Sequence, residues 1–202
     1  MSKTFGRTAM AIVAAATLGL MLTTGCRVDS HKNGGGEDVK IATPFGGMSV
    51  KTDQASVVDG VGLTVYPGAV VVKKDKDNGA ADVNMNFGGF HLGVKAISYK
   101  TTDAPDKVIA FYRKDMARYG AVILCRGNRA IGTPDHTQDG LACDKGHGSN
   151  VHVGDDDATD ELRAGSRLHQ HIVAIDPDGT GTKFALIALD LPNHLDGDKD
   201  KD

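Results

Sequence analysis

The sequence has no tryptophan, few aromatic residues and no large excess of either charge. Aromatic residues make up 5% of the 202 positions, and the formal net charge is −3. A nucleic-acid-binding surface needs clustered Lys and Arg to replace phosphate counterions, and this sequence has no such cluster. We therefore expect no nucleic-acid partner and a core built mainly from aliphatic side chains.

Cysteine is also scarce, and its odd number is informative. The three cysteines are Cys26, Cys125 and Cys143. In an exported protein a leftover thiol tends to be oxidised, so an odd count suggests that one cysteine has another use. If Cys26 is the cysteine with another use, Cys125 and Cys143 can form a disulfide, worth about 3 kcal/mol for a loop of this length. The alternative is two buried, unpaired thiols.

The amino terminus has the pattern of an export signal. Lys3 and Arg7 precede an uncharged, largely apolar run over 8–25, which ends in small residues immediately before Cys26. This run is marginal for a membrane-spanning helix, which needs about 20 apolar residues. We therefore predict a signal peptide over 1–25 that is cleaved before Cys26. An uncleaved anchor is the alternative.

The segment Leu-Thr-Thr-Gly-Cys at 22–26 resembles a lipobox, the motif at which bacterial lipoproteins are cleaved and acylated. The resemblance implies that the thiol of Cys26 carries fatty acyl chains such as palmitate. The sequence departs from the motif at Thr23, where the family usually has Leu, Val or Ile. Because Thr23 and Gly25 are both small, an ordinary signal peptidase could also cut this bond and release a plain secreted protein.

Composition divides the rest of the chain into a linker, one domain and a tail. The glycine-rich segment 26–38 is expected to be a flexible, lipid-anchored linker. The charged segment 196–202 is expected to be a disordered tail. A single folded domain is therefore expected over 39–195.

The domain has mainly the signals of strands. Strict alternation over 82–87, a Gly88-Gly89 turn and a second run over 91–99 predict one hairpin, and the apolar runs 168–175 and 183–191 predict another. One helix is predicted over 103–119, ended by Gly120, followed by a strand over 121–125. Short extended pieces are expected on both sides of Pro67-Gly68.

These elements predict an α+β fold in which a mainly antiparallel sheet carries one principal helix on one face. An all-β sandwich with one helix is the alternative. The lipobox, the Val-Tyr-Pro-Gly-Ala segment at 65–69 and the helical segment 103–120 together resemble a group of bacterial lipoproteins with a small α+β domain. The resemblance implies a location in the cell envelope and no particular reaction.

Histidines form the one candidate site. His169 and His171 alternate on a predicted strand, so both side chains should point to the same face and could bind zinc or another divalent metal. His147 and His152 could supply further ligands. The alternative is a set of solvated polar side chains, in which case the protein has no cofactor.

The sequence contains no enzymatic signature. We therefore expect an exported lipoprotein with a non-catalytic binding or structural domain, whose protein or small-molecule partner the sequence does not identify. The alternative is a metal-binding or metal-dependent protein built on His169 and His171. Lipoproteins retained in the inner membrane often have Asp after the cysteine, whereas this chain has Arg27, so we expect a periplasm-facing anchor in the outer membrane.

Overall fold

The computed structural model describes residues 26–33, 36–73, 79–143 and 159–193. Two α-helices are described, α1 (Gln54–Val61) and α2 (Pro105–Met116), and a 3₁₀ turn, η1 (Ala117–Tyr119), continues α2. The strands are β1 (Arg27–Asn33), β2 (Gly36–Thr43), β3 (Gly46–Lys51), β4 (Val70–Val71), β5 (Ala80–Phe87), β6 (Phe90–Thr101), β7 (Ile123–Arg126), β8 (Arg129–Ala130), β9 (Asp160–Gly165), β10 (His169–Asp178) and β11 (Gly181–Asp190).

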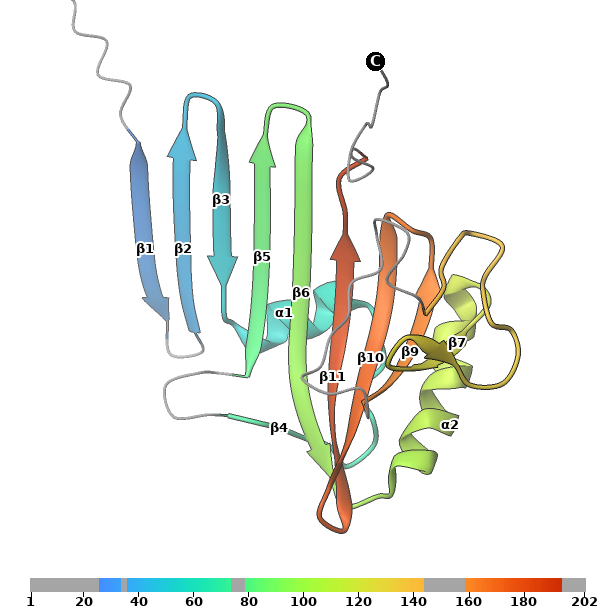
Figure 1. The fold of residues 1–202 in the computed structure, drawn as a ribbon. Helices are drawn as coiled ribbons and strands as arrows, with labels where there is room; N and C mark the ends of the chain where they lie inside the picture. The colour runs from blue at the N-terminus through green and yellow to red at the C-terminus, as the bar shows by residue number, and fades with distance from the viewer. Residues whose placement is uncertain (1–25, 34–35, 74–78, 144–158, 194–202) are drawn as a thin grey trace, which may run out of the picture.

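The strands form one sheet in which every pair is antiparallel. Their order is β1-β2-β3-β5-β6-β11-β10-β9-β7-β8, and the short β4 pairs with the far end of β6 (Figure 1). Neighbouring strands are joined by hairpins at Thr43–Gly46, Phe87–Phe90 and Asp178–Gly181. The outermost described strand at the amino-terminal side is β1, which begins one residue after Cys26.

Both helices pack on one face of the sheet, which we call the inner face. Helix α1 begins at Asp53, whose carboxylate accepts a hydrogen bond from the backbone N–H of Ser56, and ends at Gly62. Helix α2 begins with Pro105, which has no N–H to leave unpaired. The buried side chains under the helices form the main core, which includes Val57, Val61, Ile97, Tyr99, Val108, Tyr112, Met116, Val173, Ile175, Phe184 and Leu186.

The opposite, outer face is covered at the carboxy-terminal side. Cys125 of β7 is bonded to Cys143, with 5.4 Å between their Cα atoms, and this bridge closes a loop over the end of the sheet. Ile123 and Leu141 are buried beside it. The side chains of Ile172, Ala174, Ile187 and Leu189 on β10 and β11 are also buried on this face. The predicted disulfide is therefore present in the structure.

Much of the predicted fold is confirmed. The hairpins appear as β5–β6 and β10–β11, and the predicted helix appears as α2 followed by η1. The predicted strand over 121–125 appears as β7. The described strands form one sheet, whereas the alternative of a β-sandwich needs two. The fold is predominantly antiparallel sheet with helices on one face.

Three expectations differ from the structure. The segment 26–38 was expected to be a flexible linker, but its residues 27–33 form β1 and its residues 36–38 belong to β2. The described residues contain two helices rather than one principal helix, since α1 was not predicted. The residues Leu63–Tyr66 form no strand, because Thr64 is instead hydrogen-bonded to α2. The expected tail, 196–202, lies outside the described residues.

Candidate functional site

The two predicted histidines lie on the inner face of β10, as the alternation of the strand requires, but they have different surroundings. Nδ1 of His169 lies 2.8 Å from Oδ1 of Asp190, which is its cross-strand partner on β11. The side chain of His169 is largely exposed, and that of Asp190 is partly exposed. This is a surface pair in which the carboxylate orients the imidazole, an arrangement of modest strength in water.

His171 is half-buried and stacks on an aromatic ring. Its imidazole lies parallel to the ring of Tyr119, with centroids 3.6 Å apart. Burial lowers the pKa of His171, the positive charge of Arg118 lowers it further, and Asp190 acts in the opposite direction. The imidazole is therefore held in its neutral form over a wider pH range than a free histidine. Its Nδ1 is buried and has no hydrogen-bond partner among the described residues.

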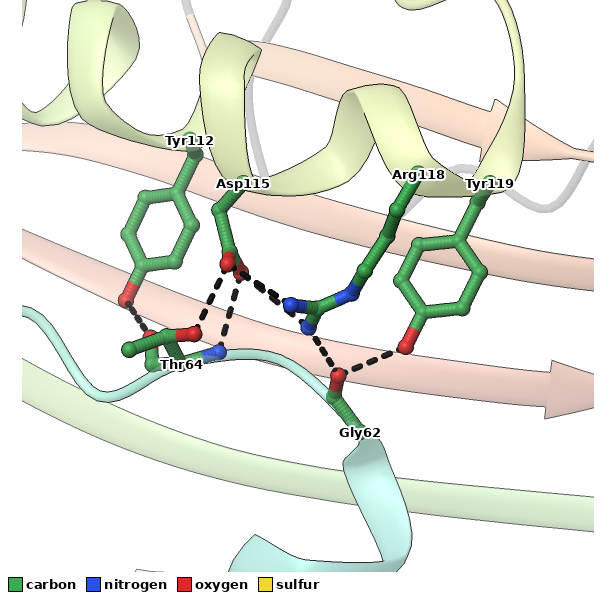
Figure 2. A network of polar contacts seen from close by, with 6 residues as sticks. All are labelled: Gly62, Thr64, Tyr112, Asp115, Arg118 and Tyr119. Carbon is green, nitrogen blue, oxygen red and sulfur yellow. Dashed lines mark hydrogen bonds and ion pairs between the residues drawn. The ribbon is translucent and has the colours of Figure 1, made fainter.

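Tyr119 belongs to a polar network that joins η1 to the segment after α1 (Figure 2). Its hydroxyl donates a hydrogen bond of 2.6 Å to the carbonyl oxygen of Gly62, and the guanidinium of Arg118 donates to the same oxygen. That carbonyl is at the carboxy-terminal end of α1, where helix carbonyls have no partner within the helix. Arg118 and Tyr119 therefore cap α1 from a distant part of the chain.

Asp115 extends the network towards Thr64. Its carboxylate accepts a bond of 2.9 Å from the backbone N–H of Thr64 and one of 2.7 Å from the Thr64 hydroxyl. Nη1 of Arg118 lies 3.0 Å from the same carboxylate. Tyr112 donates from its hydroxyl to the carbonyl oxygen of Thr64 at 3.1 Å. Every polar group drawn in Figure 2 thus contacts another part of the same protein, which is what a structural clasp between α1 and α2 requires.

Gly62 shows how tightly the clasp is packed. It adopts a left-handed conformation, with φ of +71°, which favours glycine. A Cβ atom at this position would lie 2.8 Å from the hydroxyl of Tyr119 and 3.7 Å from Nε2 of His171. The clasp and the histidine therefore share one contact surface, and His171 is part of the packing between the helices and the sheet.

The structure does not bring a metal-binding set together within the part of the chain that it describes. No group of three or more His, Cys, Asp or Glu side chains there is placed to hold a metal ion. The predicted ligands His147 and His152 lie outside the described residues. His169 and His171 do share a face, but one is paired with Asp190 and the other is stacked on Tyr119. Zinc binding by these histidines stays a prediction.

A second buried polar group lies near the disulfide. The carboxylate of Glu161 and the guanidinium of Arg163 are almost fully buried, with Nη2 and Oε2 2.5 Å apart. Arg163 also donates to the carbonyl oxygen of Ala142, beside Cys143. The pair therefore connects β9 to the disulfide loop. It was not predicted, because Arg and Glu in a sequence ordinarily indicate an exposed position.

Cys26 stands apart from the other two cysteines. Its thiol is exposed and not bridged, and the strand β1 starts at the next residue. In the described ranges, no helix has both the length and the apolar character needed to cross a bilayer.

A comparison of the chain with known protein families, with curated proteins and with solved structures finds no match.

Proposed function

We propose that the chain is an exported lipoprotein of the bacterial cell envelope, held at a membrane through acyl chains on Cys26. Its folded part serves as a non-catalytic binding or structural domain. One observation carries the proposal. The disulfide between Cys125 and Cys143 uses two of the three cysteines and leaves an exposed thiol at Cys26. A disulfide is typical of an oxidising compartment, which requires export.

The described polar clusters support a non-catalytic role. Asp115, Arg118 and Tyr119 bond to the backbone or side chains of 62–64 and so fasten α1 to α2. Glu161 and Arg163 are buried against the disulfide loop, where a soluble substrate has no access. Each cluster has a stabilising role that explains its geometry without a reaction.

The experiment that tests the proposal is metabolic labelling of the full chain with radioactive palmitate in a bacterial host. We expect label in the wild-type protein, an intact mass that begins at an acylated Cys26, and complete loss of label in Cys26→Ser. The matched control is the double variant Cys125→Ser, Cys143→Ser, which keeps the label because its acceptor is intact. Label that persists in Cys26→Ser would overturn the proposal.

The proposal includes the outer membrane as the site of anchoring, because Arg27 rather than Asp follows the cysteine. Density-gradient separation of the two membranes tests this part. We expect the labelled protein with the outer membrane, and redistribution to the inner membrane in Arg27→Asp. A wild-type protein found in the inner-membrane fraction would contradict it.

A further inference from the structure

The amino-terminal side of the sheet has an outer face that is apolar across five strands. We call β1, β2 and β3, together with residues 83–94 of β5 and β6, the open region (Figure 1). The strand register aligns one outer-face residue of each strand at the same level, and the next level follows two residues further along. The first level consists of Val28, Ile41, Met48, Met85 and Leu92. The second consists of Ser30, Val39, Val50, Val83 and Val94.

The inner face of the same strands is polar. Cross-strand neighbours at one level are Asp29, Lys40, Ser49 and Asn84, and those at the next level are His31, Asp38, Lys51, Asp82 and Lys95. Alternation of apolar and polar residues means that one face of a sheet is packed and the other is solvated. In the open region the helices lie on the polar side, so the apolar side faces away from the main core.

This apolar outer face is accessible. Val28 is 62% exposed and Ile41 is 36% exposed. At the hairpin ends Phe87 and Phe90 continue the outer face with exposures of 39% and 40%, and Phe45 at the β2–β3 turn is 81% exposed. With strands about 4.8 Å apart, the face is about 19 Å wide from β1 to β6. Exposed apolar surfaces of this kind usually mark sites of interaction with a protein or a membrane.

The position of Cys26 indicates what covers the apolar outer face of the open region. Arg27 pairs with Ala42, one residue before the β2–β3 turn, so Cys26 lies at the level of the hairpin ends. Continued alternation along β1 places Cys26 on the same face as Val28. Figure 1 shows that β1 begins at the end of the sheet where the β2–β3 and β5–β6 hairpins turn. Acyl chains on Cys26 would therefore leave the protein beside this apolar surface.

We propose that the outer face of the open region rests on the lipid bilayer that holds the anchor, with Phe45, Phe87 and Phe90 at the membrane interface. The proposal depends on the proposed acylation of Cys26. Because β1 starts directly after Cys26, no residue lies between the acylated cysteine and the sheet. A short tether keeps the face at a high effective concentration next to the bilayer, so a modest apolar surface is enough to bind.

The far border of the face agrees with this orientation. Two residues beyond the second level, the outer face of β1 and β2 carries Lys32 and Glu37, whose charged groups are 3.8 Å apart and exposed. A charged pair belongs in water or at the headgroups rather than among acyl chains. The apolar levels therefore lie between the acylated cysteine and the first charged level, as expected for a contact that begins at the anchor.

The test uses the absence of tryptophan from the chain, which allows single-tryptophan reporters. The full chain is produced in bacteria with Ile41→Trp or Phe90→Trp, purified in its processed form and reconstituted into vesicles of phosphatidylethanolamine and phosphatidylglycerol. The matched control is Lys114→Trp, an exposed position on α2 at the inner side of the sheet. Some vesicles contain brominated acyl chains, which quench only tryptophans in contact with lipid.

We expect the emission of Trp at positions 41 and 90 to shift to shorter wavelength on reconstitution and to be largely lost in brominated vesicles. Trp at position 114 should keep its emission. Acylated, vesicle-bound protein with no quenching at 41 and 90, or with equal quenching at all three positions, would overturn the orientation while leaving the anchor intact. A blue shift without lipid in a dimeric protein would assign the face to a second copy and would also overturn it.

Failure of the proposed function gives a different result. If Cys26 carries no lipid, the purified mass lacks the acyl chains and the protein does not float with the vesicles on a density gradient. Mass and flotation are measured on the same samples as the fluorescence, so the two proposals are separated. A variant that removes two of the three exposed phenylalanines sharpens the result. Phe87→Ser, Phe90→Ser should leave flotation unchanged and reduce quenching at position 41.

Discussion

The helix-covered region and the open region use the same sheet in opposite ways. Under the helices the inner face is apolar, and Val173, Leu186 and Ile97 are aligned across β10, β11 and β6. In the open region the inner face is charged and the apolar residues point outward. The helix-covered region thus has buried apolar residues on both faces of the sheet, whereas the open region has its apolar residues mainly on the outer face. The helix-covered region, called the covered region below, can therefore be stable through its own packing. The open region instead has an apolar face that the helices of the protein do not cover.

The largest expected effect tests a buried charge in the covered region. Glu161→Gln should lower the free energy of unfolding by about 3 to 5 kcal/mol, because it leaves the buried guanidinium of Arg163 without its counter-charge. The matched change in the open region is Lys40→Ala, since the side chain of Lys40 is 60% exposed and lies 3.9 Å from the partly exposed carboxylate of Asp38. That change should cost less than about 1 kcal/mol. Urea unfolding measures both.

A double variant separates the charge from the packing at this site. Glu161→Leu with Arg163→Met removes both charges at similar volume, so it should recover a large part of the stability lost in Glu161→Gln. If Glu161→Gln and Lys40→Ala cost the same, the difference in burial between the two regions has no energetic consequence and the comparison fails.

A matched pair of isoleucines gives the next largest effect. Ile97 is 1% exposed under the helices, and Ile41 is 36% exposed on the outer face. Ile97→Ala should lower the free energy of unfolding by about 2 to 5 kcal/mol, because it removes buried methyl groups and leaves a cavity. Ile41→Ala should cost less than about 1 kcal/mol. Similar losses at the two sites, measured by urea unfolding without lipid, would show that the open face is covered in solution.

The sequence predicted the covered region better than the open region, and the reason is physical. The helical spacing over 103–119 and the apolar runs over 168–175 and 183–191 each report a buried face in the covered region, and these elements are present. In the open region, strict alternation over 82–87 did predict β5. In the amino-terminal strands, the glycines at 34–36 and 46–47 suggested a linker and a turn. The alternation of Asp38, Val39, Lys40 and Ile41 was there to be seen, but short strands next to glycine give little signal.

The candidate site was predicted less well than the fold. The alternation of side chains along a strand correctly placed His169 and His171 on one face. The odd number of cysteines correctly suggested that Cys125 pairs with Cys143. The contact of Tyr119 with His171 joins residues 52 positions apart in the sequence, so no local pattern could reveal it. Helix α1 was missed because it has only eight residues, which include Gly60 in the last turn and three valines, and both residue types lower helix propensity.

A third prediction compares two glycines of the covered region. Gly62 and Gly68 have nearly equal φ values of +71° and +75°, but only Gly62 is enclosed, by Tyr119 and His171. Gly68→Ala should cost about 1 to 2 kcal/mol from its left-handed conformation alone. Gly62→Ala should cost more, because its Cβ also displaces the hydroxyl of Tyr119. Thermal unfolding of the two variants measures the difference in lost stability. Equal losses would mean that the hydroxyl of Tyr119 can move away from the new Cβ atom at no cost.

The smallest expected effect is a pH dependence that originates in the covered region. Because burial and the charge of Arg118 lower the pKa of His171 in the folded protein, the unfolded chain binds the proton more strongly, with an ordinary pKa of about 6.5. The free energy of unfolding should therefore decrease as the pH falls below about 7 and level off below the lowered folded pKa. His171→Phe keeps an aromatic ring against Tyr119 but cannot titrate, so it should reduce this slope in urea unfolding at a series of pH values.

Hydrogen exchange should show the acid-induced opening first in α2 and β10, which hold the imidazole, and later in β2 and β3. A slope that is unchanged in His171→Phe would assign the pH dependence to other groups and remove the covered region as its source.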